Sequence, residues 1–245
     1  MNHAGFSVTR VIRVTTFSFN GFFGGLVQIT AAWIALFFLY GGLLQGYGAF
    51  DLIIRLSLVV ATKIKSGVAQ TAVIASMVVG MINGASTANA AMTGAVTIPL
   101  MKKHGLSARS AGAIEAVSSS GGQIMPPIMG AAAFIMASLL STSYTNILLA
   151  GLIPAALFYI TVALSVHYIA SDELERAAED LNVTAESMNI EPKAREELFF
   201  EAIKHIIPFA TLIWVLGILQ YSITYSALVT VAVTIATGII VPLVR

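Results

Sequence analysis

The 245-residue chain has no cysteine and few charged side chains, and both shortages exclude whole classes of protein. Without cysteine there is no disulfide, no thiolate metal site and no cysteine nucleophile. Charged residues make up only 10% of the chain, whereas a soluble domain usually carries about 25%. The formal net charge is +1, which indicates neither a nucleic acid nor an acidic partner. No Gly-x4-Gly-Lys-Ser/Thr phosphate loop is present, which disfavours a primary pump.

Histidine is equally sparse, and the histidines do not form a catalytic or metal-binding pattern. Their spacing matches no metal-ligand motif, and no nucleophile stands beside a base. An intramembrane enzyme is therefore a poor interpretation of the sequence. The four histidines are His3, His104, His167 and His205.

The chain is rich in apolar residues, at 57% of the sequence, and its mean hydropathy is +0.87. This composition predicts an all-α polytopic membrane protein, because a helix satisfies its own backbone groups in lipid. Ten of the twelve acidic residues lie between Asp172 and Glu201, which leaves Asp51 and Glu115. A carboxylate inside apolar sequence suggests a functional site. Glu115 either forms a site wall that attracts an ion or pairs structurally with a residue such as Arg109.

Residues 1–66 are predicted to hold a mildly amphipathic N-terminal segment, one span and one interfacial helix. The first 20 residues lack the features of a signal peptide, and they are typical of an interfacial helix or a loop. Gly24–Leu44 is long enough to cross a membrane once. Asp51–Ser66 has one apolar face interrupted by basic residues, as expected for a helix at the interface.

Beyond residue 140 the sequence predicts three more spans and one hydrophilic insert. Residues 141–169 form a span. Residues 170–204 form an acidic cytoplasmic insert, which Pro192 divides into helical pieces. Residues 205–245 form two further spans.

Residues 67–140 are predicted to be the transport core. Its first part, residues 67–101, is predicted to form a re-entrant helical hairpin. Its arms are each about 16 residues long, which is shorter than the roughly 17–25 residues of a normal span. Basic residues flank both ends and place both on the cytoplasmic side. Two short spans joined by a Gly/Ser hinge are the alternative. The flanking residues are Lys63, Lys65, Lys102 and Lys103.

The hairpin tip, Asn83–Thr87, carries residues suited to a binding site. Gly84 permits a tight turn. Ser86 and Thr87 are predicted to cap the second arm and to leave oxygens free. The N-terminus of that arm, pointing into the protein, favours an anion.

A second interruption, Ser118–Pro127, divides the predicted span at 107–140. Pro126 and Pro127 have no amide donors, and Gly121 and Gly122 loosen the backbone before them. Carbonyl groups near the break then lack helical partners and suit a hard cation such as Na⁺. A kinked structural helix is the alternative, since Pro and Gly are common in membrane helices.

The central sequence resembles the large membrane subunit of the TRAP transporters (tripartite ATP-independent periplasmic transporters). The resemblance is best to the TAXI-type permeases, in which the large and small membrane subunits are often fused. Two long motifs and several shorter ones carry the resemblance in the family's order. They are Gly80–Asn89, Thr93-Gly94, Ile98–Lys103, Ala111–Glu115 and Gly121–Phe134.

The resemblance implies an elevator-type, Na⁺-coupled secondary transporter that imports organic anions such as carboxylates through the cytoplasmic (inner) membrane. It implies an extracytoplasmic substrate-binding protein and a small membrane subunit as partners. No cofactor besides Na⁺ as coupling ion and no nucleic acid are expected. The tip and the broken helix should meet and share the ion near Ser86, Ser119 and Gly122.

The candidate ion- and substrate-binding residues come from the two interruptions and from Glu115. Seven of them follow from the family's motifs, whereas Asn83 stands where the family often has serine. The full set is Asn83, Gly84, Ser86, Thr87, Asn89, Glu115, Ser118, Ser119, Ser120, Gly121, Gly122, Gln123, Pro126 and Pro127.

The family's large subunit has a second, inverted half, and no internal repeat is visible within this sequence. We therefore expect the chain to correspond to the first half, with the second half as a further partner that completes the ion site. The competing interpretation is a truncated, non-transporting scaffold subunit in the membrane.

Overall fold

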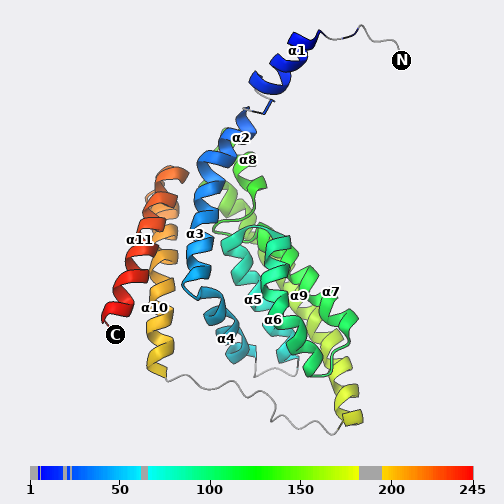
Figure 1. Cartoon of the computed structure of the whole chain (residues 1–245). Coiled ribbons are helices and arrows are strands. Elements are labelled where there is room, and N and C mark those ends of the chain that lie inside the picture. The colour runs from blue at the N-terminus through cyan, green and yellow to red at the C-terminus, as the bar shows by residue number, and fades with distance from the viewer. Residues whose placement is uncertain are drawn as a thin grey trace.

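In the computed structural model of the protein, every regular element among the described residues is a helix (Figure 1). The described residues are 5, 7–18, 21–22, 24–61, 66–181 and 195–244. Lys63, Lys65 and Pro192, which entered the predictions above, lie outside these ranges, as does most of the central part of the predicted insert.

The N-terminal part forms a helix that projects away from the remainder and then a longer apolar helix (Figure 1). The projecting helix is α1 (Val8–Ile12) with η1 (Arg13–Phe17). The longer helix consists of α2 (Gly25–Ile29), η2 (Thr30–Ile34) and α3 (Ala35–Gly46). Gly48, which has φ +84°, turns the chain into α4 (Ala49–Ala61).

The centre of the molecule is a helical hairpin followed by an interrupted helix. The hairpin consists of α5 (Gly67–Asn83) and α6 (Ser86–Lys103). Ser107 caps the N-terminus of the next helix, α7, by accepting a hydrogen bond from the amide of Ser110. The interrupted helix consists of α7 (Ala108–Gly121), η3 (Gly122–Ile124) and α8 (Ala131–Leu139).

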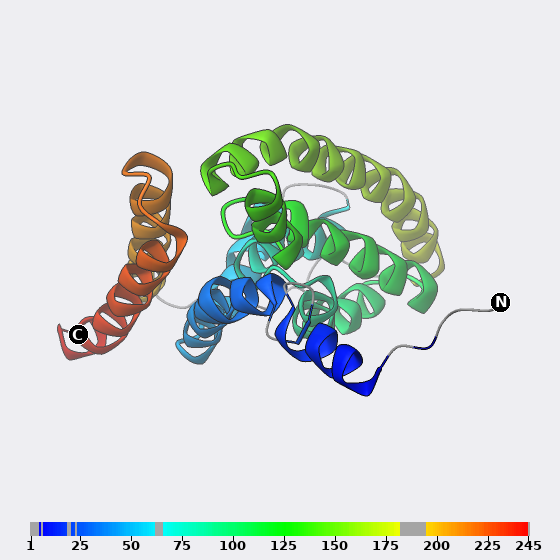
Figure 2. The ribbon, with the colours of Figure 1, turned by 90° about the horizontal axis from the view of Figure 1, so that it is seen from above.

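Of the remaining helices, α9 (Tyr144–Leu181) borders this centre directly, whereas the last two helices stand apart from it, beyond α3 (Figure 2). α9 curves around the outside of α5 and α7 and contacts both. It continues as one helix past residue 170, where the sequence predicted the start of the insert. On the other side, α11 packs against α3 and pairs with α10. This pair comprises α10 (Arg195–Leu212), η5 (Ile213–Ile218) and α11 (Ile223–Val244).

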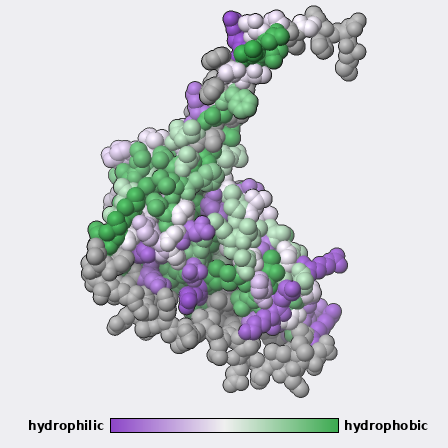
Figure 3. Space-filling model, viewed as in Figure 1, coloured by the Kyte–Doolittle hydropathy of each residue, from purple (hydrophilic) through white to green (hydrophobic). Residues whose placement is uncertain are grey.

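Four described helices are long and apolar enough to cross a membrane, which confirms the prediction of an all-α membrane protein. Hydrophobic side chains cover much of the surface, and hydrophilic ones gather at the end where α6 passes into α7 (Figure 3). Exposed leucine and isoleucine residues on α9 and α11 are compatible with lipid. The four helices are Val27–Gly46, Tyr144–Arg176, Glu201–Ile218 and Ile223–Val241.

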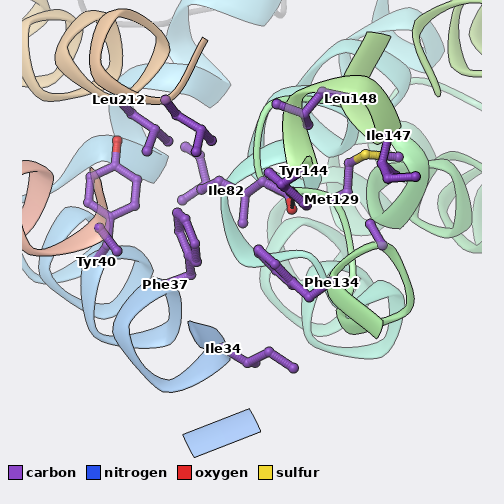
Figure 4. Close-up of a cluster of buried hydrophobic side chains, with 14 of the residues drawn as sticks. Ile34, Phe37, Tyr40, Ile82, Met129, Phe134, Tyr144, Ile147, Leu148 and Leu212 are labelled. Carbon is purple, nitrogen blue, oxygen red and sulfur yellow. Dashed lines mark hydrogen bonds between the residues drawn. The ribbon is translucent and has the colours of Figure 1, made fainter. Parts of the chain in front are cut away.

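A hydrophobic cluster fixes the interrupted helix to α3 and α9 (Figure 4). The ring of Phe134 on α8 stacks on Tyr144 with centroids 4.5 Å apart, and on Phe37 of α3 at 5.3 Å. The Tyr144 hydroxyl donates hydrogen bonds to the carbonyl oxygens of Pro127 and Ile128. One aromatic stack therefore holds α8 and also satisfies polar backbone groups in the break.

Replacing Phe134 by alanine should destabilise the fold by about 3 kcal/mol or more, because it leaves a cavity in this stack. Phe134 is 2% exposed, whereas Leu139 on the same helix is 73% exposed and makes a matched control. Thermal unfolding of the purified protein in detergent should show a clearly lower midpoint for Phe134→Ala and little change for Leu139→Ala. Equal shifts in the two variants would contradict the role assigned to the stack.

Candidate functional site

Three helices, α5, α6 and α7, meet along faces made of small and polar side chains. Residues four apart on a helix lie on the same face. On α6 this spacing aligns Asn89, Thr93 and Thr97, all of them buried. On α7 it aligns Glu115 with Ser119. The short side chains let the helices approach closely and bring their polar atoms together.

The centre of this contact is the carboxylate of Glu115, which is only 2% exposed. Four hydroxyl groups donate hydrogen bonds to it. Its Oε1 accepts from Ser76 at 2.9 Å, from Thr93 at 2.5 Å and from Ser119 at 2.8 Å. Its Oε2 accepts from Thr97 at 2.5 Å. We call these five residues the hydroxyl cage.

The hydroxyl cage matches the chemistry of an ionised carboxylate, which only accepts hydrogen bonds and has about four lone-pair sites. Gly94 leaves room for the side chain, because a Cβ there would lie 3.1 Å from Cγ of Glu115. The sequence offered Arg109 as a partner for Glu115. Arg109 instead is exposed and lines a groove between α7 and α9. No ion pair to Glu115 occurs among the described residues.

Asn89 connects the hydroxyl cage to the helix interruption. Its Nδ2 donates to the carbonyl oxygen of Ser76 at 2.8 Å and more weakly to that of Ser119 at 3.5 Å. Its Oδ1 is buried and has no hydrogen-bond partner within the described part of the chain. The same holds for the hydroxyl of Ser118. Two buried oxygens are thus left for water or a ligand.

The hairpin and the interruption touch through glycine backbones, at what we call the tip–break junction. A Cβ on Gly80 of α5 would overlap the Cα of Gly122 at the start of the break. A Cβ on Gly84 at the tip would overlap the carbonyl of Met129 at the end of the break. The tip and the break therefore meet, as the sequence led us to expect.

The tip itself is a tight turn. Gly84 has φ +62° and ends α5 in the left-handed conformation that glycine favours. Asn83 supports the turn by accepting a hydrogen bond from the amide of Ala85 at 3.1 Å. The predicted capping role of Ser86 and Thr87 is wrong, because Ala85 occupies the N-cap position and no side chain caps α6. The Ser86 hydroxyl accordingly makes no hydrogen bond among the described residues.

The break begins at Gly122, four residues later than predicted. Ser118 stays helical, and its carbonyl oxygen accepts a hydrogen bond from the hydroxyl of Tyr159 on α9 at 3.0 Å. The helix ends because Pro126 and Pro127 supply no amide hydrogens; the peptide bond between them is cis. Within the described ranges, no hydrogen bond of good geometry reaches the carbonyls of Ile124, Met125 or Pro126, although residues 126–128 form a turn.

Some predicted site residues face elsewhere. Ser120 is exposed, and its hydroxyl donates to the carbonyl of Ala116 in its own helix at 2.7 Å. Gln123 is exposed as well, although its carbonyl accepts from the amide of Gly130 at 2.7 Å. Gly121 faces the rings of Phe158 and Tyr159 on α9, where a larger residue would overlap them.

Sequence reasoning missed three members of the hydroxyl cage, namely Ser76, Thr93 and Thr97. The signal was present, because Asn89, Thr93 and Thr97 are spaced by four within an uncharged helix. Such a stripe marks one polar face, and the nearest buried group that needs donors is Glu115. Among the described residues there is no cluster of three His, Cys, Asp or Glu that could hold a metal.

Adding a methyl group at Gly80 should push α5 away from the break, because the obstacle is the backbone of Gly122. We expect Gly80→Ala to lower the thermal unfolding midpoint clearly. Gly112 in α7 has open space around its Cβ position. There, Gly112→Ala should be neutral or stabilising by up to about 1 kcal/mol, since alanine is the better helix former. An unchanged midpoint in Gly80→Ala would show that the junction is looser than described.

Comparison with known proteins gives one family and two curated relatives. Residues 4–245 match the family described as "Tripartite ATP-independent periplasmic transporter, DctM component". The uncharacterized protein y4mL of Sinorhizobium fredii is 30% identical over 124 residues, which is 51% of this chain and 29% of the relative. The uncharacterized protein YgiK of Salmonella typhimurium is 30% identical over 142 residues, which is 57% of this chain and 32% of the relative.

The matched region spans about a third of the length of each of these relatives. The family match, by contrast, runs over nearly the whole chain and includes both the hairpin and the interrupted helix. The chain therefore belongs to the DctM family, the large membrane component of the tripartite ATP-independent periplasmic transporters.

Proposed function

We propose that the chain is part of the permease of a Na⁺-coupled, binding-protein-dependent secondary transporter that imports organic anions such as carboxylates. The observation that carries this proposal is the tip–break junction. A helical hairpin tip meets an interrupted helix there, and both contribute polar groups with no partner in the described structure. Interrupted helices of this kind supply the ion and substrate sites of many secondary transporters.

The cation site in this proposal lies between the tip and the break. The carbonyl oxygens of Ile124 and Met125 have no partner among the described residues, and the Ser86 hydroxyl is similarly uncommitted. Na⁺ prefers such neutral oxygens. Ser119, which the sequence placed near the ion, uses its hydroxyl in the hydroxyl cage instead. Its predicted part in the ion site therefore passes to Ser86 and the break, and the hairpin meets the break where Gly80 lies against Gly122 and Gly84 against Met129.

The anion site is proposed at the N-terminus of α6. Helix N-termini present free amides and a partial positive charge, which favour a carboxylate. No acidic side chain occurs in the first turn of α6. Movement of α5, α6 and α7 as one body, held together by the hydroxyl cage, would carry the site across the membrane in an elevator mechanism.

The proposed partners are an extracytoplasmic binding protein, a small membrane subunit and a second half of the permease that completes the ion site. Exposed apolar residues on the membrane-length helices leave area for lipid and for these subunits. The direction of import and the inner membrane as location are part of the same proposal.

The proposal is tested by uptake into proteoliposomes that contain the permease chain with its small subunit, second half and binding protein. A mixture of mono- and dicarboxylates serves as substrate, and accumulation is measured by mass spectrometry. We expect accumulation of an organic anion only under an inward Na⁺ gradient, with a K⁺ gradient as control. Absence of any accumulation, with the subunits still co-purifying, would favour a scaffold subunit without transport.

Within this assay, Ser86→Ala should raise the Na⁺ concentration for half-maximal uptake by about tenfold, the effect of losing about 1.4 kcal/mol of binding. Ser120→Ala is the matched control, because that serine lies near the break but faces outward and bonds to its own helix. It should leave the Na⁺ dependence unchanged. Equal behaviour of the two variants would remove Ser86 from the ion site.

A further inference from the structure

The hydroxyl cage surrounds a buried carboxyl group that has no positive side chain bonded to it in the described structure. α5 contributes Ser76 to its surroundings, and α6 contributes Thr93 and Thr97. The nearest titratable group from α9 is Tyr159, whose hydroxyl is committed to the carbonyl of Ser118. In the described part of the chain, no lysine, arginine or histidine bonds to the carboxylate. An uncompensated buried charge is costly, so its presence requires an explanation.

The cage is too closely occupied to hold an ion itself. All four hydroxyl oxygens lie within 2.5 to 2.9 Å of the carboxylate oxygens and leave little space between them. A cation bound between them would have to displace these donors. The balancing charge must therefore lie outside the cage but close enough to interact with it.

A short path of contacts leads from Glu115 to the tip–break junction. Glu115 bonds to the hydroxyl of Ser119, and Asn89 reaches the carbonyl of Ser119. The amide nitrogen of Asn89 also lies beside Gly122, 3.1 Å from where a Cβ on that glycine would sit. Only buried side chains and backbone lie along this path, so water screens the charge little.

We propose that Glu115 is a positioning residue that acts by its charge: the hydroxyl cage holds its carboxylate ionised, and the fixed negative charge strengthens cation binding at the tip–break junction. This inference rests on the proposed function, since it assigns a role in the same cation site. Glu115 does not touch the ion. In this proposal the hydroxyl donors of the cage stabilise the charged form of the carboxylate in the protein interior, as several hydrogen bonds to a charged group do.

The expected effect is on the order of tenfold in cation affinity. Two opposite unit charges about 10 Å apart still attract each other appreciably at an effective dielectric constant of about 20. That interaction corresponds to a factor of more than about ten in a dissociation constant.

The test is calorimetric titration of Na⁺ into the permease in lipid nanodiscs, with choline chloride keeping the ionic strength constant. Glu115→Gln removes the charge and keeps the shape, while Glu115→Asp keeps the charge. Thr97→Val keeps the charge but removes one donor of the cage. Thr71→Val is the matched control, because Thr71 is buried and bonds only to the carbonyl of Gly67 in its own helix.

We expect Glu115→Gln to raise the Na⁺ dissociation constant by about tenfold. Glu115→Asp and Thr71→Val should stay within about threefold of the wild type, while Thr97→Val, which loses the one donor to Oε2, should fall between them and Glu115→Gln. Equal weakening by Glu115→Gln and by the control Thr71→Val would overturn the inference, since it would indicate structural damage rather than loss of charge. An unchanged constant in Glu115→Gln would overturn it as well.

Two other outcomes of the titration would also be informative. If Glu115→Gln does not fold, as judged by its thermal unfolding, a loss of Na⁺ binding in Glu115→Asp would by itself contradict the inference, because that variant retains the charge. If the wild-type protein binds no Na⁺ at all, the proposed sodium coupling fails first, and this is visible before any variant is made.

Discussion

The direct contact of Gly80 with Gly122 is the constraint on which the central architecture depends. A helix can be interrupted in apolar surroundings only where other parts of the protein cover or satisfy its polar backbone. Here the hairpin approaches the break at backbone distance, which no larger residue permits. Around that contact, Tyr144 satisfies the carbonyls of Pro127 and Ile128, while Phe134 packs on the Tyr144 ring. The break is thus held rigidly on both sides, while a few of its carbonyl oxygens stay without a partner in the described structure.

The hydroxyl cage solves a second problem of the same helices, which is to bury a carboxylate without a cation beside it. Threonine and serine suit this task because each brings one donor on a short side chain, so the helices stay close. Thr93 and Thr97 also lie near the carbonyls of Asn89 and Thr93, at 2.8 Å and 3.0 Å. Each hydroxyl has a single hydrogen, so these carbonyls compete with Glu115 for it and hold the hydroxyl oxygen at a fixed place on the helix. The cage therefore joins α5, α6 and α7 into one body while it stabilises a charge.

Much of this fold follows from the sequence, because helix length and apolar runs determine where helices form. Asn83-Gly84 marked the tip, and the double proline marked the break, since both act through local backbone geometry. The exact start of the break was wrong by four residues, because Tyr159, distant in sequence, supports the last turn of α7. Glu115 stood out by its charge alone. Its donors Ser76 and Thr97 come from other helices, and only packing reveals which polar residues of a helix face a given carboxylate.

In the proposed mechanism the fixed negative charge of Glu115 has one further consequence, because the proposed substrate is itself an anion. Before the cation binds, the field of Glu115 opposes a carboxylate at the N-terminus of α6 and partly cancels the attraction of the helix dipole. Once the cation occupies the junction, it neutralises that field and adds an attraction of its own. The same charge that strengthens cation binding therefore penalises the anion alone, and the two ligands bind favourably only together. Coupling of anion to cation would in this way follow from electrostatics, without any conformational signal between separate sites.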